Sequence, residues 1–384
     1  MLQAHLTRIN ELQRRMKDEG AGLFLVADPD SLFYLCGFWG YLSMDFGRAT
    51  LLGVPLAGEP TLITPAMEAE MARAMTGLHD IREWTDGLDG EWMKHVSNLL
   101  SGKPGQIIML EPLKTHPRVV TTVRESASDA KLRDGTSLIS AMRMVKSAEE
   151  IAVMREAGQV AVAMVTGGKA AIAEGVPEYE VALAIIGAGT RKAAEFLSSQ
   201  GQDQFVSPTI YNLQIMQSGR HTCMVHRRST VKRIAKGDPV YFCFCGIANF
   251  KQFKLGFDRE FFVGSATEEQ ARTYETAVKA QQAALTMVKP GAIAEDVNAA
   301  AEEIYRSSGF GLSYRTGRGI GYSFLEEPQL KKGDKTPLQA GMTFAVDGGI
   351  TIPGKFGARV GDSIVVTEGG FEYLTDYPRD FAIV

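Results

Sequence analysis

The stretch that decides the fold runs from His226 to Arg259 and reads HRRSTVKRIAKGDPVYFCFCGIANFKQFKLGFDR. A Lys-Gly-Asp turn precedes the apolar run 240–245, whose β-branched and aromatic side chains are typical of a buried strand. A polar connection follows, and residues 257–263 return as a partner strand. The sequence therefore predicts a hairpin with an imidazole, His226, at its entrance and a carboxylate, Asp258, on its return.

The composition bounds the function classes that this hairpin can serve. A chain of 384 residues is long enough for two domains and a large core. Its formal net charge of −4 argues against a general nucleic-acid-binding surface. The apolar runs are only as long as strands, so we expect no membrane span. Four cysteines without a CxxC pair indicate reduced thiols and a cytoplasmic protein.

Two domains are expected, with a boundary near residues 143–150. Helices and strands alternate over the first 140 or so residues, which predicts a compact α/β domain over 1–142. Ser147 with Glu150 three positions later forms a capping box, which opens a long helix of the second domain, 143–384. Two similar segments, 174–181 and 290–297, each follow an Ala-rich helix and suggest two related halves.

Four later segments, together with the hairpin, resemble the catalytic domain of the pita-bread proteins. These proteins include methionine aminopeptidase, aminopeptidase P, prolidase, creatinase and ectoine hydrolase. The later segments are 314–321, 325–328, 338–347 and 357–367. The resemblance implies an α/β pita-bread catalytic domain behind a smaller creatinase-type α/β domain, assembled as a homodimer.

The metal-binding positions of the peptidases are changed in this chain. On the family pattern, those five positions read Cys243, Gly256, Arg318, Asp347 and Gly361. A two-metal site needs about five oxygen or nitrogen ligands, and a guanidinium stays protonated and repels a cation. The resemblance to the metal-free members therefore implies that no metal or other cofactor is bound and that the chain is not a metallopeptidase.

Among the metal-free members, creatinase gives the site roles. The resemblance implies that His226 shuttles a proton while Asp258 and Asp347 hold a cationic amidine-like group. Arg318 and the Arg48 of a partner subunit would bind the carboxylate of a small zwitterionic substrate. The expected activity is metal-independent hydrolysis of a non-peptide C–N bond.

The remaining substrate-binding candidates follow from the same resemblance. Phe46 and Arg48 lie in a Phe-Gly-Arg element that, in creatinase, reaches into the active site of the partner subunit. Cys243 and Glu326 lie in matching segments and are expected to line the pocket.

Three further functions also fit the sequence. The C-terminal half resembles ectoine hydrolase as well, which implies ring opening of a small substrate. The second further function is that of a lyase acting on a small zwitterion. The third is that of a non-catalytic binding module. The residues also have structural explanations: His226 fits a surface histidine, Asp258 an ion pair with its neighbour in the chain, Asp347 a turn, and Cys243 a core position.

Overall fold

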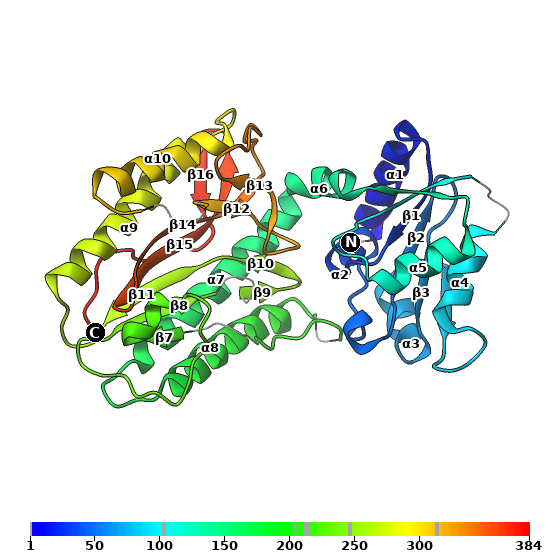
Figure 1. The fold of residues 1–384 in the computed structure, drawn as a ribbon. Helices are drawn as coiled ribbons and strands as arrows, with labels where there is room; N and C mark the ends of the chain where they lie inside the picture. The colour runs from blue at the N-terminus through cyan, green and yellow to red at the C-terminus, as the bar shows by residue number, and fades with distance from the viewer. Residues whose placement is uncertain (1, 102–104, 203, 211–215, 245–247, 312–314) are drawn as a thin grey trace. The chain divides into compact units, whose positions relative to one another are not determined.

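The computed structural model describes residues 2–101, 105–202, 204–210, 216–244, 248–311 and 315–384. The chain divides into two compact units, Met1–Met142 and Arg143–Val384 (Figure 1). Within the described ranges, no helix has the length and apolar character needed to span a bilayer.

Unit 1 is built on a six-stranded mixed sheet in the order β4-β3-β2-β1-β5-β6 within the described residues. The strands are β1 (Ala21–Val26), β2 (Leu51–Pro55), β3 (Thr61–Pro65), β4 (Asp80–Trp84), β5 (Ile107–Leu110) and β6 (Lys131–Asp134). The helices are α1 (Leu2–Asp18), α2 (Pro29–Cys36), α3 (Ala66–Met75), α4 (Glu91–Leu100), α5 (Pro117–Ser126) and α6 (Thr136–Met144), with a short 3-10 turn, η1 (Met44–Phe46).

Local sequence signals explain the start of α2 and one face of this sheet. Asp28 caps α2 by accepting a hydrogen bond from the Ser31 amide, as its place before Pro29 suggests. Alternate residues of β1, including Leu23 and Leu25, pack against Trp92 of α4 in one buried cluster.

Two helix pairs and one large sheet form unit 2. The helices are α7 (Ala148–Ala171), α8 (Glu178–Ser199), α9 (Glu268–Met287) and α10 (Ala294–Ser307). The capping box that the sequence predicts is confirmed at the start of α7, where Ser147 and Glu150 bond reciprocally. The two similar segments of the sequence lie in equivalent places, at the turn within each helix pair.

Within the described residues, the sheet of unit 2 has eight strands in the order β13-β12-β14-β15-β11-β8-β7, with β16 paired to β15. Their bounds are β7 (Met216–Ser218), β8 (Pro239–Cys243), β11 (Asp258–Phe262), β12 (Gly317–Gly319), β13 (Glu326–Leu330), β14 (Thr343–Ile352), β15 (Phe356–Thr367) and β16 (Gly370–Tyr373). β7 leads into a short 3-10 turn, η2 (Gly219–Cys223).

The predicted hairpin is confirmed, because β8 and β11 pair antiparallel with Cys243 opposite Asp258. The connection between them holds a feature that the sequence did not predict, a small ladder of β9 (Ala248–Phe250) and β10 (Phe253–Leu255). Cys245, which the sequence places in the first strand, lies outside the described residues.

One face of this sheet, which we call the helix face, packs against α9 (Figure 1). Phe344, Val346 and Ile364 form a buried cluster there with alanines of α9. At Gly348 the approach is so close that a Cβ atom would lie 2.1 Å from the Ala277 carbonyl oxygen. The opposite side of β14 and β15 therefore carries the remaining alternate side chains.

Candidate active site

The strand register brings four of the candidate residues onto one face of the unit 2 sheet. Asp258 on β11 lies opposite Cys243 on β8 and also opposite Gly361 on β15. Gly361 in turn lies opposite Asp347 on β14. Because residues directly opposite each other share a face, Cys243, Asp258 and Asp347 point to the same side.

Arg318 belongs to the same group. It lies on β12 opposite Ala345, which is two residues from Asp347 on β14 and so shares its face. We call this side of the sheet, opposite the helix face, the site face. Its four candidate residues are all buried.

Arg318 and Asp347 form a buried ion pair in the middle of the site face. The Arg318 Nη1 donates to the Asp347 Oδ2 at 2.7 Å, and its Nε donates to the Phe324 carbonyl at 2.8 Å. The other oxygen of Asp347, Oδ1, is buried and has no hydrogen-bond partner among the described residues. Such an unsatisfied acceptor is costly unless a ligand or water uses it.

Two glycines leave room for this ion pair. A Cβ atom at Gly256 would lie 3.0 Å from the Arg318 Nη2, and a Cβ atom at Gly361 would lie 2.7 Å from the Asp347 Oδ1. Side chains at either position would therefore displace the guanidinium or the carboxylate.

Asp258 on the site face has a raised pKa. Burial, together with the nearby charge of Asp347, raises the pKa of Asp258 from 3.8 to about 6. A hydrogen bond from the Tyr241 hydroxyl to Oδ2, at 3.0 Å, and the charge of Arg318 act in the opposite direction and limit the rise. Asp258 therefore changes its protonation state close to neutral pH.

A second row of polar residues adjoins Asp258. Glu260 lies two residues along β11 and opposite Tyr241 on β8, so both share the site face. Burial raises the pKa of Glu260 to about 8, although its Oε2 accepts a hydrogen bond from the Arg359 amide at 2.8 Å. The guanidinium of Arg359 lies over the Tyr241 ring, 5.5 Å from its centre.

Glu260, Tyr241 and Arg359 are residues of this face that were not among the predicted site residues. The sequence does hold one signal for them, because side chains alternate between the two faces along a strand. This alternation puts Glu260 on the face of Asp258 and Tyr241 on the face of Cys243. It identifies a shared face, but the burial that shifts the pKa of Glu260 arises only in the folded chain.

His226 does not join the ion pair. It lies in the segment that follows η2, its side chain is exposed, and it makes no hydrogen bond or ion pair within the described part of the chain. η2 itself contacts β15, where the Thr222 carbonyl accepts a hydrogen bond from the Arg359 Nη1 at 3.1 Å. The catalytic role of His226 stays a prediction.

Glu326 is engaged within unit 2. It accepts hydrogen bonds from the Arg143 Nη2 at 2.5 Å and from the Lys146 Nζ at 2.7 Å. Burial alone would raise the pKa of Glu326, but the charges of Lys146 and Arg143 outweigh it and lower that pKa to about 2. This carboxylate closes an internal salt bridge, and its expected place in the pocket lining stays a prediction.

Phe46 and Arg48 lie in unit 1. The Arg48 guanidinium donates to the Asp86 Oδ2, at 2.6 Å from Nη2, and the exposed Phe46 ring lies 5.1 Å from the Tyr41 ring. Contact with a partner subunit stays a prediction for both residues.

The donors on the site face do not fit a divalent metal of the kind that the family pattern implies. Among the described residues, no group of three or more His, Cys, Asp and Glu side chains is arranged to hold a metal ion. The carboxylate of Asp347 is bonded to Arg318, whose positive charge lies where a cation would need donor atoms.

Comparison with known proteins gives relatives over nearly the whole chain. The agropine synthesis cyclase of Rhizobium rhizogenes is 28% identical, covering 98% of this chain and 96% of the relative. The Xaa-Pro dipeptidase of Pyrococcus furiosus is 26% identical, with coverages of 97% and 99%. The crystal structure of a Thermococcus sibiricus prolidase superposes with a TM-score of 0.86 at 25% identity, covering 98% of each chain.

These relatives correct the predicted activity. The expectation of a creatinase-like, metal-independent hydrolase of non-peptide C–N bonds, and not a metallopeptidase, was wrong. Relatives and solved structures that match this chain almost from end to end are named dipeptidases and prolidases, and this overturns the expectation. The error arose because the changed metal-ligand positions show only which donor atoms this chain offers. They do not show which bond the chain cleaves.

The predicted fold is confirmed. Residues 8–145 match the creatinase/prolidase N-terminal domain, and residues 152–368 match the family described as metallopeptidase family M24. The α/β pita-bread catalytic domain and the smaller α/β domain before it are thus both present. The chain belongs to metallopeptidase family M24.

Proposed function

We propose that this chain hydrolyses the amide bond of a dipeptide-sized substrate on the site face of unit 2. The relatives named dipeptidase and prolidase support a short peptide as the substrate class. One observation carries the proposal: Asp258, with a pKa of about 6, shares a buried face with a guanidinium held by Asp347. An acid–base group near neutrality beside a fixed positive charge supplies two needs of amide hydrolysis.

In the proposed reaction, the ionised Asp258 accepts a proton from water while the water oxygen bonds to the scissile carbonyl carbon. Negative charge then develops on the carbonyl oxygen, and the N–H groups of Arg318 stabilise it. The C–N bond breaks as Asp258 returns the proton to the leaving nitrogen. The products are a carboxylic acid and an amine, and Asp258 is again ionised.

The test is the Asp258→Asn variant, assayed with a panel of dipeptides by chromatography of the released amino acids. We expect kcat/KM to fall by about 10²–10⁴-fold, since an amide cannot accept the proton. In the wild type, kcat/KM should fall as the pH drops below about 6, where Asp258 becomes protonated. Asp376→Asn is the matched control, because this carboxylate is exposed.

Two outcomes contradict the proposal. Cleavage by Asp258→Asn at the wild-type rate would remove Asp258 from the reaction. A wild-type protein that releases no amino acid from any dipeptide of the panel would show that the substrate class is wrong.

A second candidate function is ring closure of a small substrate. It is favoured by the relative named agropine synthesis cyclase, which matches 98% of this chain, and by the donors that differ from a metallopeptidase set among the described residues. The same acid–base group would then take a proton from a nucleophile of the substrate itself. Mass spectrometry separates the two, because hydrolysis adds one water to the substrate and condensing ring closure removes one.

Two further expectations remain proposals. We infer that the chain forms a homodimer in which Phe46 and Arg48 contact the partner subunit. Light scattering after gel filtration tests the mass, and a monomer would contradict it. A cytoplasmic location is likewise a proposal, and fractionation of the source cells tests it.

A further inference from the structure

Gln217 connects the segment that carries His226 to the site face. It lies on β7 opposite Tyr241, which lies opposite Glu260 on β11. These three residues therefore form one row across the site face, next to the row that contains Asp258. The Gln217 side chain is buried, with 1% of its surface exposed.

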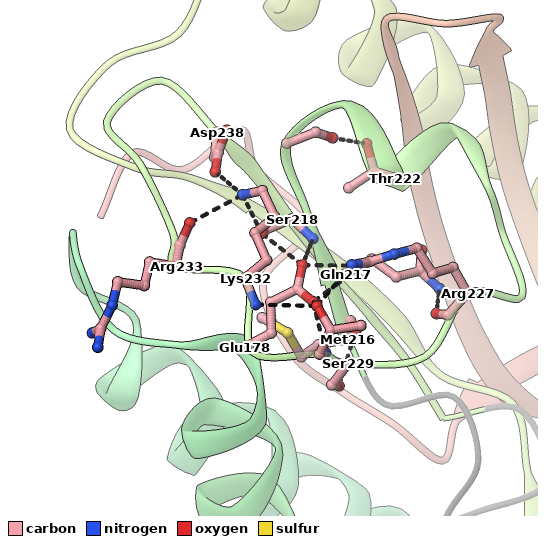
Figure 2. A network of polar contacts seen from close by, with 12 residues as sticks. Glu178, Met216, Gln217, Ser218, Thr222, Arg227, Ser229, Lys232, Arg233 and Asp238 are labelled. Atoms are coloured by element: carbon pink, nitrogen blue, oxygen red, sulfur yellow. Dashed lines mark hydrogen bonds and ion pairs between the residues drawn. The ribbon is translucent and has the colours of Figure 1, made fainter.

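The Gln217 amide holds the backbone on both sides of His226. Its Nε2 donates to the Arg227 carbonyl (Figure 2). The same Nε2 also donates to the Val225 carbonyl at 2.9 Å. These carbonyls belong to the residues immediately before and after His226. The peptide that carries the imidazole is therefore tied to the site face, at the β7 edge of the sheet.

Glu178, at the start of α8, fixes the two ends of the same segment (Figure 2). Its fully buried carboxylate accepts hydrogen bonds from the amide and hydroxyl of Ser218, before the segment, at 3.0 and 2.8 Å. After His226 it accepts from the Arg227 guanidinium, at 3.0 Å to Oε2, and from the amide and hydroxyl of Thr230, at 2.8 and 2.9 Å. All of these donors lie between Ser218 and Thr230, on both sides of His226.

The contrast between backbone and side chain at His226 is the basis of the inference. The backbone is held by buried polar groups, and burying a charged group such as Glu178 is costly unless it is fully bonded. The imidazole is exposed and makes no hydrogen bond among the described residues. The backbone beneath the imidazole is thus held in place, while the imidazole itself is open to a ligand.

We propose that Gln217 is a positioning residue that holds His226 over the site face, where the imidazole contacts the bound substrate. β7 and β11 are two strands apart, about 10 Å at the usual spacing between strands. The backbone of an extended dipeptide spans about 7 Å, and its side chains add to this reach, so a substrate at Asp258 extends toward the His226 segment. This inference rests on the proposed function for its substrate, but not for the geometry at His226.

A double-mutant cycle of Gln217→Met and His226→Ala tests the inference. We expect Gln217→Met to lower kcat/KM for a dipeptide about tenfold or more, because misplacement of a binding group has effects of this size. If Gln217 acts through His226, the double variant should be no slower than His226→Ala alone. Additive losses would overturn the proposal.

Gln281→Met is the matched control for this cycle. Gln281 is equally buried and also donates to two acceptors, the Val346 carbonyl and Asp362, but on the helix face. Its loss should combine additively with His226→Ala. If Gln217→Met does not fold, Gln217→Glu preserves the volume and removes the donor.

A measurement on the free protein separates this inference from the proposed function. Trypsin should cut after Arg227 and Arg228 several-fold faster in Gln217→Met than in the wild type at equal Tm, whereas His226→Ala should leave this rate unchanged. If the wild type cleaves no dipeptide, the proposed function fails while faster proteolysis still supports the anchoring role of Gln217. Unchanged proteolysis in Gln217→Met and Gln217→Glu would overturn it.

Discussion

The two faces of the unit 2 sheet handle buried carboxylates in opposite ways. On the helix face, Asp362 has both oxygens bonded, with Arg259 and Arg379 at 2.7 Å, Gln281 at 2.9 Å and Thr375 at 3.2 Å. On the site face, Asp347 has one buried oxygen without a partner among the described residues. Asp258 has a pKa raised to about 6.

This difference teaches that burial alone does not mark a functional carboxylate. Asp362 and Gly361 are neighbours in β15, and a one-residue step moves a side chain from one face to the other. A buried carboxylate whose oxygens are all bonded to donors stabilises the fold. A carboxylate with spare acceptor capacity and a raised pKa can bind a proton or a ligand.

The largest expected effect breaks the helix-face arrangement. Asp362→Asn should lower the free energy of unfolding by about 3–5 kcal/mol, because it leaves the buried guanidinium of Arg259 without its counter-charge. Asp258→Asn should not destabilise the protein at pH 7, since a raised pKa means that ionisation of Asp258 opposes folding there. Urea unfolding measures both variants, and equal losses would contradict the distinction between the faces.

The next effect concerns Glu260 and the pH dependence of stability. The folded pKa of about 8 exceeds the ordinary 4.5, so the unfolded chain releases this proton first, and stability falls as the pH rises from about 4.5 to about 8. Glu260→Gln should remove a decline on the order of 3 kcal/mol between pH 5 and pH 8. Unfolding curves at a series of pH values check this, and a variant as pH-dependent as the wild type would contradict it.

The smallest effect sharpens the comparison within the site face. Arg318→Met removes the positive charge that opposes the rise at Asp258, so the pKa of Asp258 should increase by roughly one unit, or about 1.4 kcal/mol. The acid limb of the pH–rate profile reports this shift, with Arg155→Met, which removes a surface ion pair, as the control. An unchanged limb would show that Arg318 does not act on Asp258.

Much of the fold was predictable because its signals are local. The capping box at Ser147 and the strand run before Cys243 depend on neighbouring residues, and both are confirmed. The β9–β10 ladder was not predictable in this way, since its residues, 248–255, read as a polar connection. The turn of this ladder holds Lys251 and Gln252 at positive φ. Glycine or asparagine usually marks such a turn in a sequence, and neither stands at these two positions.

The site was predictable only as a set of residues. Resemblance put Arg318, Asp347 and Asp258 in one place, but it gave each a substrate group as its partner. In the fold, Arg318 and Asp347 bond to each other, and Glu326 bonds to Arg143 and Lys146. Partners separated by 29 to 183 positions are set by strand order and chain path, for which the sequence pattern holds no local signal.

The two glycines beneath the ion pair restrict how this site can change by substitution. Aspartate at 256 would put its Cβ 2.6 Å from the Ala345 methyl and 3.0 Å from Arg318, and glutamate at 361 would collide with Asp347. Replacing Arg318 first would instead leave Asp347 without its counter-charge. A change from the Arg318–Asp347 pair to a site with more carboxylates therefore needs several substitutions together. Each single substitution alone would give a protein with a steric clash or an unbalanced buried charge.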